Sequence, residues 1–146
     1  MKKIFISSCL ILIMLLFSVE IEAGIEVDMQ GNTEMDFGEL TPGDYRPRVE
    51  YDDGVTVRVR NNNGGPNAPP ELFEVYFEED VKLYRVDGGS DTLRIYEFIT
   101  DLDGNIGETD HPFKRIQVGA VLESIPYSIR GGEYTGQATV VIELLD

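Results

Sequence analysis

Apolar and polar residues alternate with a period of two along most of the chain after residue 24. From Val55 to Arg60, the valines fall on one face and the threonine and arginines on the other. This pattern is typical of a β-strand with one face on a core and the other toward water. Three more segments share it, with inward rows at Phe73, Val75 and Phe77, at Ile116, Val118, Ala120 and Leu122, and at Ala138, Val140, Ile142 and Leu144.

One further strand changes phase partway along its length. Leu93 and Ile95 share one face, and Tyr96 and Phe98 then take over the apolar row. An extra residue in one strand of a pair, a β-bulge, produces such a change. We therefore predict a bulge within residues 94–97, with Tyr96 and Phe98 inward beyond it.

Glycine-containing turns separate the alternating segments, because glycine and aspartate tolerate the positive φ that tight turns need. No segment after residue 24 shows helical periodicity. About eight short strands at close spacing predict an all-β fold, an antiparallel β-sandwich, in a single domain over residues 24–146. The turn signals are Asp53-Gly54, Asp87-Gly88-Gly89, Asp103-Gly104 and Gly131-Gly132, and residues 61–70 form a longer loop rich in asparagine and proline.

The first 23 residues have the pattern of a secretory signal peptide. Lys2 and Lys3 precede an apolar run from Cys9 to Phe17, and Ala23 provides a small residue for cleavage. The apolar run is shorter than the roughly 20 residues of a spanning helix, although an uncleaved N-terminal anchor is the alternative. We therefore expect export to the periplasm or the cell surface, with no membrane span after cleavage.

Cysteine content and charge narrow the expected chemistry of the exported domain. Cys9 is the only cysteine and lies in the leader, so the mature domain is expected to have no disulfide and no cysteine-ligated metal. The net charge of the chain is −15, and a leader with two lysines and two glutamates leaves that value unchanged. Such acidity favours solubility and disfavours nucleic acid as a partner, because phosphates would be repelled.

Two segments at the ends of the expected domain carry a family resemblance. Residues 35–43 read as a strand that ends in Phe37-Gly38 and then a Pro42-Gly43 turn. Residues 131–142 enter a last alternating strand through Gly132-Glu133-Tyr134-Thr135-Gly136. This arrangement resembles pilin-like domains, namely the spore-coat-U-like secreted pilins of the archaic chaperone–usher type and related immunoglobulin-like surface domains. The chain departs from them in lacking their cysteine pair.

The resemblance implies a fold that lacks one strand, which a neighbour's N-terminal extension supplies. Ile25, Val27 and Met29 alternate with acidic residues, so residues 24–30 are the candidate donor strand. Strand addition works through backbone hydrogen bonds, with alternate side chains filling a groove in the partner. The alternative, which the number of short strands favours, is that these residues form the first strand of their own domain.

The sequence offers little for catalysis. His111 is the only histidine and precedes a proline in a polar segment, so a multi-histidine metal site is excluded. No serine stands in a nucleophile-elbow sequence. We therefore expect a protein that is not an enzyme.

Residues 101–110 form the best-defined polar cluster. Asp101, Asp103 and Asn105 provide oxygens at alternate positions, which suits calcium and makes it the only cofactor candidate. Ile106 stands where an EF-hand requires glycine, so this is not an EF-hand loop. The alternative, which the turn chemistry favours, is a hairpin on Asp103-Gly104.

These observations leave two functional hypotheses. The first is an exported structural or adhesive protein that acts through strand edges and loops, with self-association by β-strand addition. The second is a secreted ligand-binding module, with calcium at the acidic loop.

Overall fold

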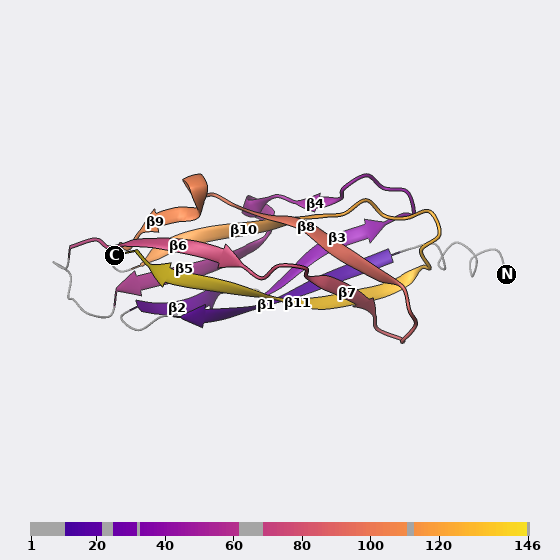
Figure 1. Ribbon diagram of the computed structural model, residues 1–146, viewed down its shortest axis with the longest axis horizontal. Helices are drawn as coiled ribbons and strands as arrows, with labels where there is room; N and C mark the ends of the chain where they lie inside the picture. Colours follow the sequence, from indigo (N-terminus) through magenta and orange to yellow (C-terminus); the bar gives the residue numbers. More distant parts are fainter. Residues whose placement is uncertain (1–10, 22–24, 32, 62–68, 111–112, 146) are drawn as a thin grey trace.

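The computed structural model describes residues 11–21, 25–31, 33–61, 69–110 and 113–145, and these form an elongated all-β fold (Figure 1). The only helical segments among them are two three-residue 3-10 turns, so the expected all-β class is confirmed. The strands are β1 (Ile11–Ile21), β2 (Ile25–Gln30), β3 (Glu34–Leu40), β4 (Arg48–Val49), β5 (Val55–Asn61), β6 (Leu72–Phe77), β7 (Lys82–Arg85), β8 (Thr92–Thr100), β9 (Ile106–Glu108), β10 (Lys114–Leu122) and β11 (Gly132–Leu144), and the 3-10 turns are η1 (Tyr51–Asp53) and η2 (Asp103–Asn105).

The strands form one curled, mixed sheet. Its order is β2-β5-β10-β8-β7-β11-β1-β3, with β4 also paired to β10, and β6 paired to both β11 and β9. The curl brings β1 into contact with β2, although these two strands are not neighbours in the sheet. Every described pair is antiparallel except β1 with β11, which is parallel. The antiparallel expectation therefore holds for all described pairs but this one.

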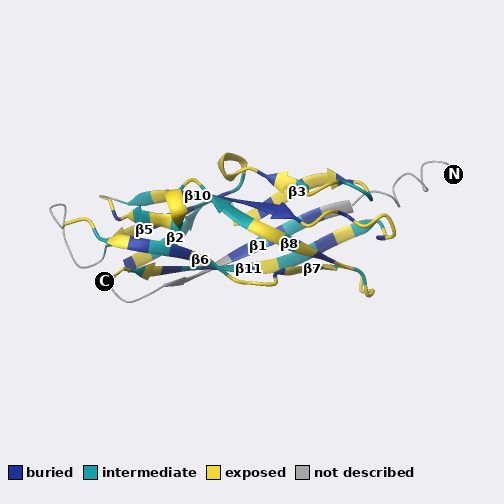
Figure 2. Cartoon of the chain, turned by 45° about the horizontal axis from the view of Figure 1, so that its top comes forward, coloured by how far each residue is buried: buried dark blue, intermediate teal, exposed yellow. Residues whose placement is uncertain are grey.

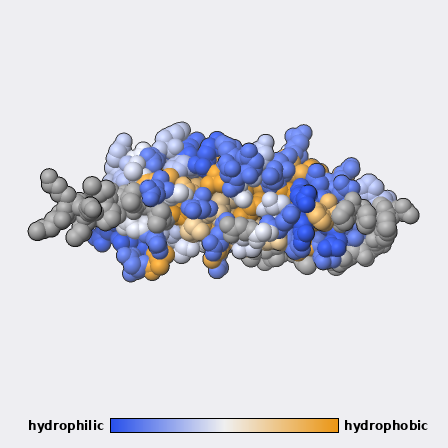
Figure 3. All heavy atoms as spheres, turned by 180° about the vertical axis from the view of Figure 1, so that it is seen from behind, coloured by the Kyte–Doolittle hydropathy of each residue, from blue (hydrophilic) through white to orange (hydrophobic). Residues whose placement is uncertain are grey.

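The alternating rows form the core, as predicted. Val55, Val57 and Val59 are at most 1% exposed, and the inward positions of β10 and β11 are equally buried up to Ile142. Figure 2 shows buried segments running through the middle of the sheet, with exposed residues on its outer faces and turns. Viewed from behind, hydrophilic residues cover most of the surface around a narrow apolar strip (Figure 3).

The predicted bulge is present, but one of its consequences was wrong. The register of β8 against β10 shifts between Glu97 and Ile95, so Tyr96 is the extra residue. Phe98 is partly buried as expected. Tyr96 is 48% exposed instead of inward, because the bulged residue has no partner opposite it and turns outward.

Two of the predicted turns differ in their structural role. Asp87-Gly88-Gly89 joins β7 and β8, which pair with each other as a hairpin. Asp103-Gly104 lies in η2 and does not form the favoured hairpin, since β9 pairs with β6 rather than with β8. The turn connects β8 to β9, which pair with different strands of the curled sheet. Which strand β9 pairs with depends on distant segments and not on the residues of the turn.

Part of the predicted signal peptide belongs to the sheet. Residues 11–21 form β1, while residues 1–10 and 22–24, with the expected cleavage point at Ala23, lie outside the described residues. Cleavage of this leader stays a prediction. Among the described residues, no helix is both long and apolar enough to cross a membrane.

Candidate functional site: the strand slot between β3 and β11

The position of β1 between β3 and β11 is the most unusual feature of the sheet, and we call this position the strand slot. β1 runs parallel to β11 in an unbroken register from Ile11 opposite Gly132 to Ile21 opposite Ile142. On its other side it pairs antiparallel with β3, with one register shift after Leu12. β1 and β11 lie side by side in Figure 1. A segment predicted to be cleaved is thus an interior strand of the full chain.

Side chains of β1 fill the interior beneath the strand slot. Ile13 and Leu15 are fully buried, and Phe17 is 8% exposed. Leu15 lies opposite Gly136, and Phe17 opposite Ala138, so small residues on β11 face two large ones on β1. The Phe17 ring also meets the Phe98 ring edge-on, with 5.8 Å between centroids. These contacts place β1 in the same core cluster as the rest of the domain.

β3 depends on β1 for its place in the sheet. In the described part of the chain, β1 is the only strand that pairs with β3. Met35, Phe37 and Leu40 on β3 are nonetheless buried in the core. Without β1, the long edge of β11 and the inner edge of β3 would both have unpaired backbone groups, which is the situation that invites another strand.

The candidate donor strand lies at the opposite end of the sheet. Residues 25–30 form β2, an edge strand that pairs antiparallel with β5 of the same chain. Ile25 is buried, whereas Val27 and Met29 are partly buried against the core. Within this chain the segment is therefore an edge strand of its own sheet. Whether it also serves a neighbouring copy stays a prediction.

Ion pairs hold the polar face of β2 on β5. Arg58 donates from Nε to Asp28 Oδ1 at 2.7 Å and from Nη2 to Asp28 Oδ2 at 2.5 Å. Arg60 and Glu26 form a looser pair with 3.5 Å between Nη2 and Oε1. The hydrogen bonds from Arg58 lower the pKa of the Asp28 carboxyl, because they stabilise its charged form. This fork-shaped contact fixes the register of β2 as well as attaching it.

The acidic loop uses two of its three candidate calcium ligands for its own structure. Asp101 Oδ1 accepts the backbone N–H of Gln117 at 3.0 Å, and Asn105 Oδ1 accepts the hydroxyl of Thr100 at 2.8 Å. Asp103 is exposed at the start of η2. No three His, Cys, Asp or Glu side chains in the described part of the chain are placed to hold a metal ion. Calcium binding by Asp101, Asp103 and Asn105 stays a prediction, and His111 lies outside the described residues.

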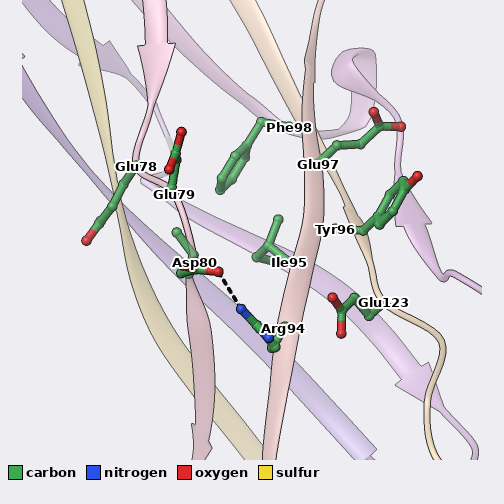
Figure 4. Close-up of a pocket in the computed structure, with 10 residues that line it drawn as sticks. Glu78, Glu79, Asp80, Arg94, Ile95, Tyr96, Glu97, Phe98 and Glu123 are labelled. Carbon is green, nitrogen blue, oxygen red and sulfur yellow. Dashed lines mark hydrogen bonds and ion pairs between the residues drawn. The ribbon is translucent and has the colours of Figure 1, made fainter.

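The sequence did not predict a groove that lies along β8, between the segment before β7 and the end of β10. It has a volume of about 470 Å³, and acidic side chains stand around the apolar Ile95 and Phe98 (Figure 4). An ion pair between Arg94 and Asp80 crosses one end. The carboxylates come from three segments that are distant in the sequence, so no local motif predicts that they lie together. They are Glu78, Glu79, Asp80, Glu97 and Glu123.

No protein-family model matches the chain, and no curated protein sequence is significantly similar to it. The resemblance to pilin-like domains therefore rests on the residues quoted above.

Proposed function

We propose that the chain is the precursor of an exported structural or adhesive subunit that acts by β-strand addition and not by catalysis. On this proposal the curled sheet is a β-sandwich of the immunoglobulin-like or pilin-like kind. The observation that carries the proposal is the position of β1. A segment with the pattern of a removable leader occupies the interior of the sheet, so its removal leaves the domain one strand short.

The energetic cost of an empty strand slot is large. Burying a large apolar side chain contributes about 1.5–3 kcal/mol, so Ile13, Leu15 and Phe17 together contribute about 4.5–9 kcal/mol. Whole domains are stable by only about 5–15 kcal/mol. The mature chain would also leave the backbone groups along β11 unpaired. A strand from another molecule that filled the slot would restore both contributions.

The N-terminal segment of a second copy is the proposed donor. Ile25, Val27 and Met29 are apolar at every second position, which is the spacing of the three inward side chains of β1. Cleavage after Ala23 would make this segment the new N-terminus, at an edge of the sheet where β5 is the one described strand that pairs with it. Release from β5 requires breaking the Asp28–Arg58 contact, so exchange between copies is expected to be slow.

Light scattering over a range of concentrations tests the proposal with three chains. The full chain, kept uncleaved by cytoplasmic expression, is expected to stay monomeric because β1 fills its slot. Residues 24–146 are expected to form oligomers. Residues 31–146 are expected not to associate by strand exchange, because they keep the slot and lack the donor.

A peptide of residues 11–21, flanked by lysines for solubility, provides the matched control. It is expected to bind residues 24–146 and to suppress their association. If residues 31–146 associate, the assignment of residues 24–30 as the donor is wrong, whereas the proposal that a strand fills the slot is unaffected. A mature chain that is monomeric at every concentration, with the thermal stability of the full chain, would overturn strand addition. Such a stable monomer would mean that β3 closes the empty slot by moving about one strand spacing, roughly 4.8 Å, to pair with β11.

A further inference from the structure

Two loops lie at the end of the molecule opposite the C-terminal end of β11 (Figure 1), and hydrogen bonds join them. The first, residues 41–47, links β3 to β4, and the second, residues 123–131, links β10 to β11. Ile125 and Ile129 anchor the second loop in the core. Three hydrogen bonds connect the two loops, from the Ile125 amide to the Asp44 carbonyl (2.9 Å), from the Gly43 amide to the Ile125 carbonyl (2.9 Å) and from the Arg46 amide to Ser124 Oγ (3.3 Å). The Leu122 amide at the end of β10 also donates to the Pro47 carbonyl (2.8 Å).

These two loops carry the two most exposed large hydrophobic side chains of the described residues. Tyr127 is 87% exposed and Tyr45 is 78% exposed. The Tyr127 ring lies directly on Gly43, where an added Cβ would come within 2.4 Å of Tyr127 Cε1. Gly43 also has a φ of +92°, a conformation that suits glycine. The loop therefore presents an aromatic ring to solvent on a firmly held backbone.

Arg46 joins this pair of tyrosines to a third. Its guanidinium carbon lies 3.9 Å from the centre of the Tyr96 ring and 5.4 Å from that of Tyr45. Arg46 has a φ of +41°, which is uncommon for a residue with a side chain, and such conformations concentrate at functional sites. Tyr96 is the bulged residue of β8, and bulges often re-aim a side chain in this way. The backbone conformation of Arg46 and the bulge at Tyr96 thus bring Tyr45, Arg46 and Tyr96 together, and Tyr127 lies against Gly43 in the same pair of loops. We call Tyr45, Arg46, Tyr96 and Tyr127 the tyrosine platform.

The chemistry of the tyrosine platform indicates the kind of ligand. A tyrosine ring combines a flat apolar face with a hydroxyl that can hydrogen-bond. These two features suit the C–H face and the hydroxyls of a sugar ring. Glu97 and Glu123 lie beside Tyr96 at the rim of the acidic groove (Figure 4) and offer further acceptors for sugar hydroxyls. These carboxylates and the net charge of −15 disfavour anionic ligands. A neutral polyhydroxylated ring satisfies all of these conditions.

We propose that the tyrosine platform is a binding site for neutral glycans. The site is complete in the full chain, so it depends neither on the strand slot nor on leader removal. Neutral glycans would be the ligands through which the proposed adhesive protein attaches.

The test is titration of the full chain with neutral hexasaccharides of glucose, mannose, galactose and N-acetylglucosamine, followed by NMR and calorimetry. Anionic oligogalacturonate is the charge control. We expect at least one neutral probe to bind with a Kd of about 1 mM or tighter. We expect Tyr45→Ala and Tyr127→Ala each to weaken that binding by about tenfold or more. Thermal stability should not change, because both side chains are exposed.

Tyr84→Ala is the matched control, since Tyr84 is 54% exposed on β7 and outside both loops. It is expected to leave glycan binding unchanged. The proposal is overturned if no neutral probe binds at about 5 mM, or if only the anionic probe binds. Equal effects of Tyr84→Ala and Tyr127→Ala would overturn it as well. Binding of a protein at the platform, with no neutral sugar competing, would likewise refute the glycan assignment.

Discussion

Replacement of Leu15 by alanine in the full chain tests whether β1, which lies in the predicted leader, is part of the core. Leu15 is fully buried and lies between Gly136 on β11 and Met35 on β3. Leucine-to-alanine changes in a packed core cost about 2–5 kcal/mol, because transfer energy is lost and a cavity remains. For a chain of this size, that loss lowers the melting temperature by roughly 5–15 °C.

Leu16→Ala provides a control of the same chemistry one residue away. Leu16 is on the opposite face of β1 and only partly buried. Its replacement is expected to cost about 1 kcal/mol or less. Urea and thermal unfolding of both variants, made with the leader retained, measure the difference. If the two variants are equally stable, or if both match the unchanged chain, β1 does not occupy the strand slot.

Two further predictions concern the candidate donor strand and the acidic loop. Because Arg58 lowers the folded-state pKa of Asp28, the pair stabilises the fold above the usual aspartate pKa of about 3.9 and loses this effect as pH falls through the lower folded value. Asp28→Asn is therefore expected to lower the melting temperature more at pH 6 than at pH 3; a difference that stays constant over this range would contradict the assignment. Calcium is expected to leave the melting temperature unchanged, because Asp101 and Asn105 already accept hydrogen bonds within the protein, and a clear rise with calcium would instead favour the calcium-loop hypothesis.

Local features of the fold were predictable because they depend on neighbouring residues. The valines of β5 and the inward row of β10 are buried as their alternation predicts. The change of phase near Ile95 located the bulge correctly. The outward turn of Tyr96 was missed, because alternation says nothing about a residue that has no partner across the sheet.

The candidate sites were less predictable, since they join segments that are distant in the chain. The continuous apolar run of the leader fits a signal peptide, and the same run also suits a buried strand. Its place beside β11 depends on residues more than a hundred positions away, at Gly136 and Ala138. The tyrosine platform likewise joins Tyr45, Tyr96 and Tyr127, which no local motif connects.

The sequence alone determined the all-β class, most of the core positions, the acidic character and the leader pattern, because periodicity, composition and charge are properties of short segments or of the whole chain. The tertiary structure decided which strands are neighbours, and therefore that β1 fills the strand slot and that β2 is held to β5 through Asp28 and Arg58. Strand pairing is set by side-chain fit between distant segments. The two proposed sites follow from that pairing, and so they became visible only in the folded chain.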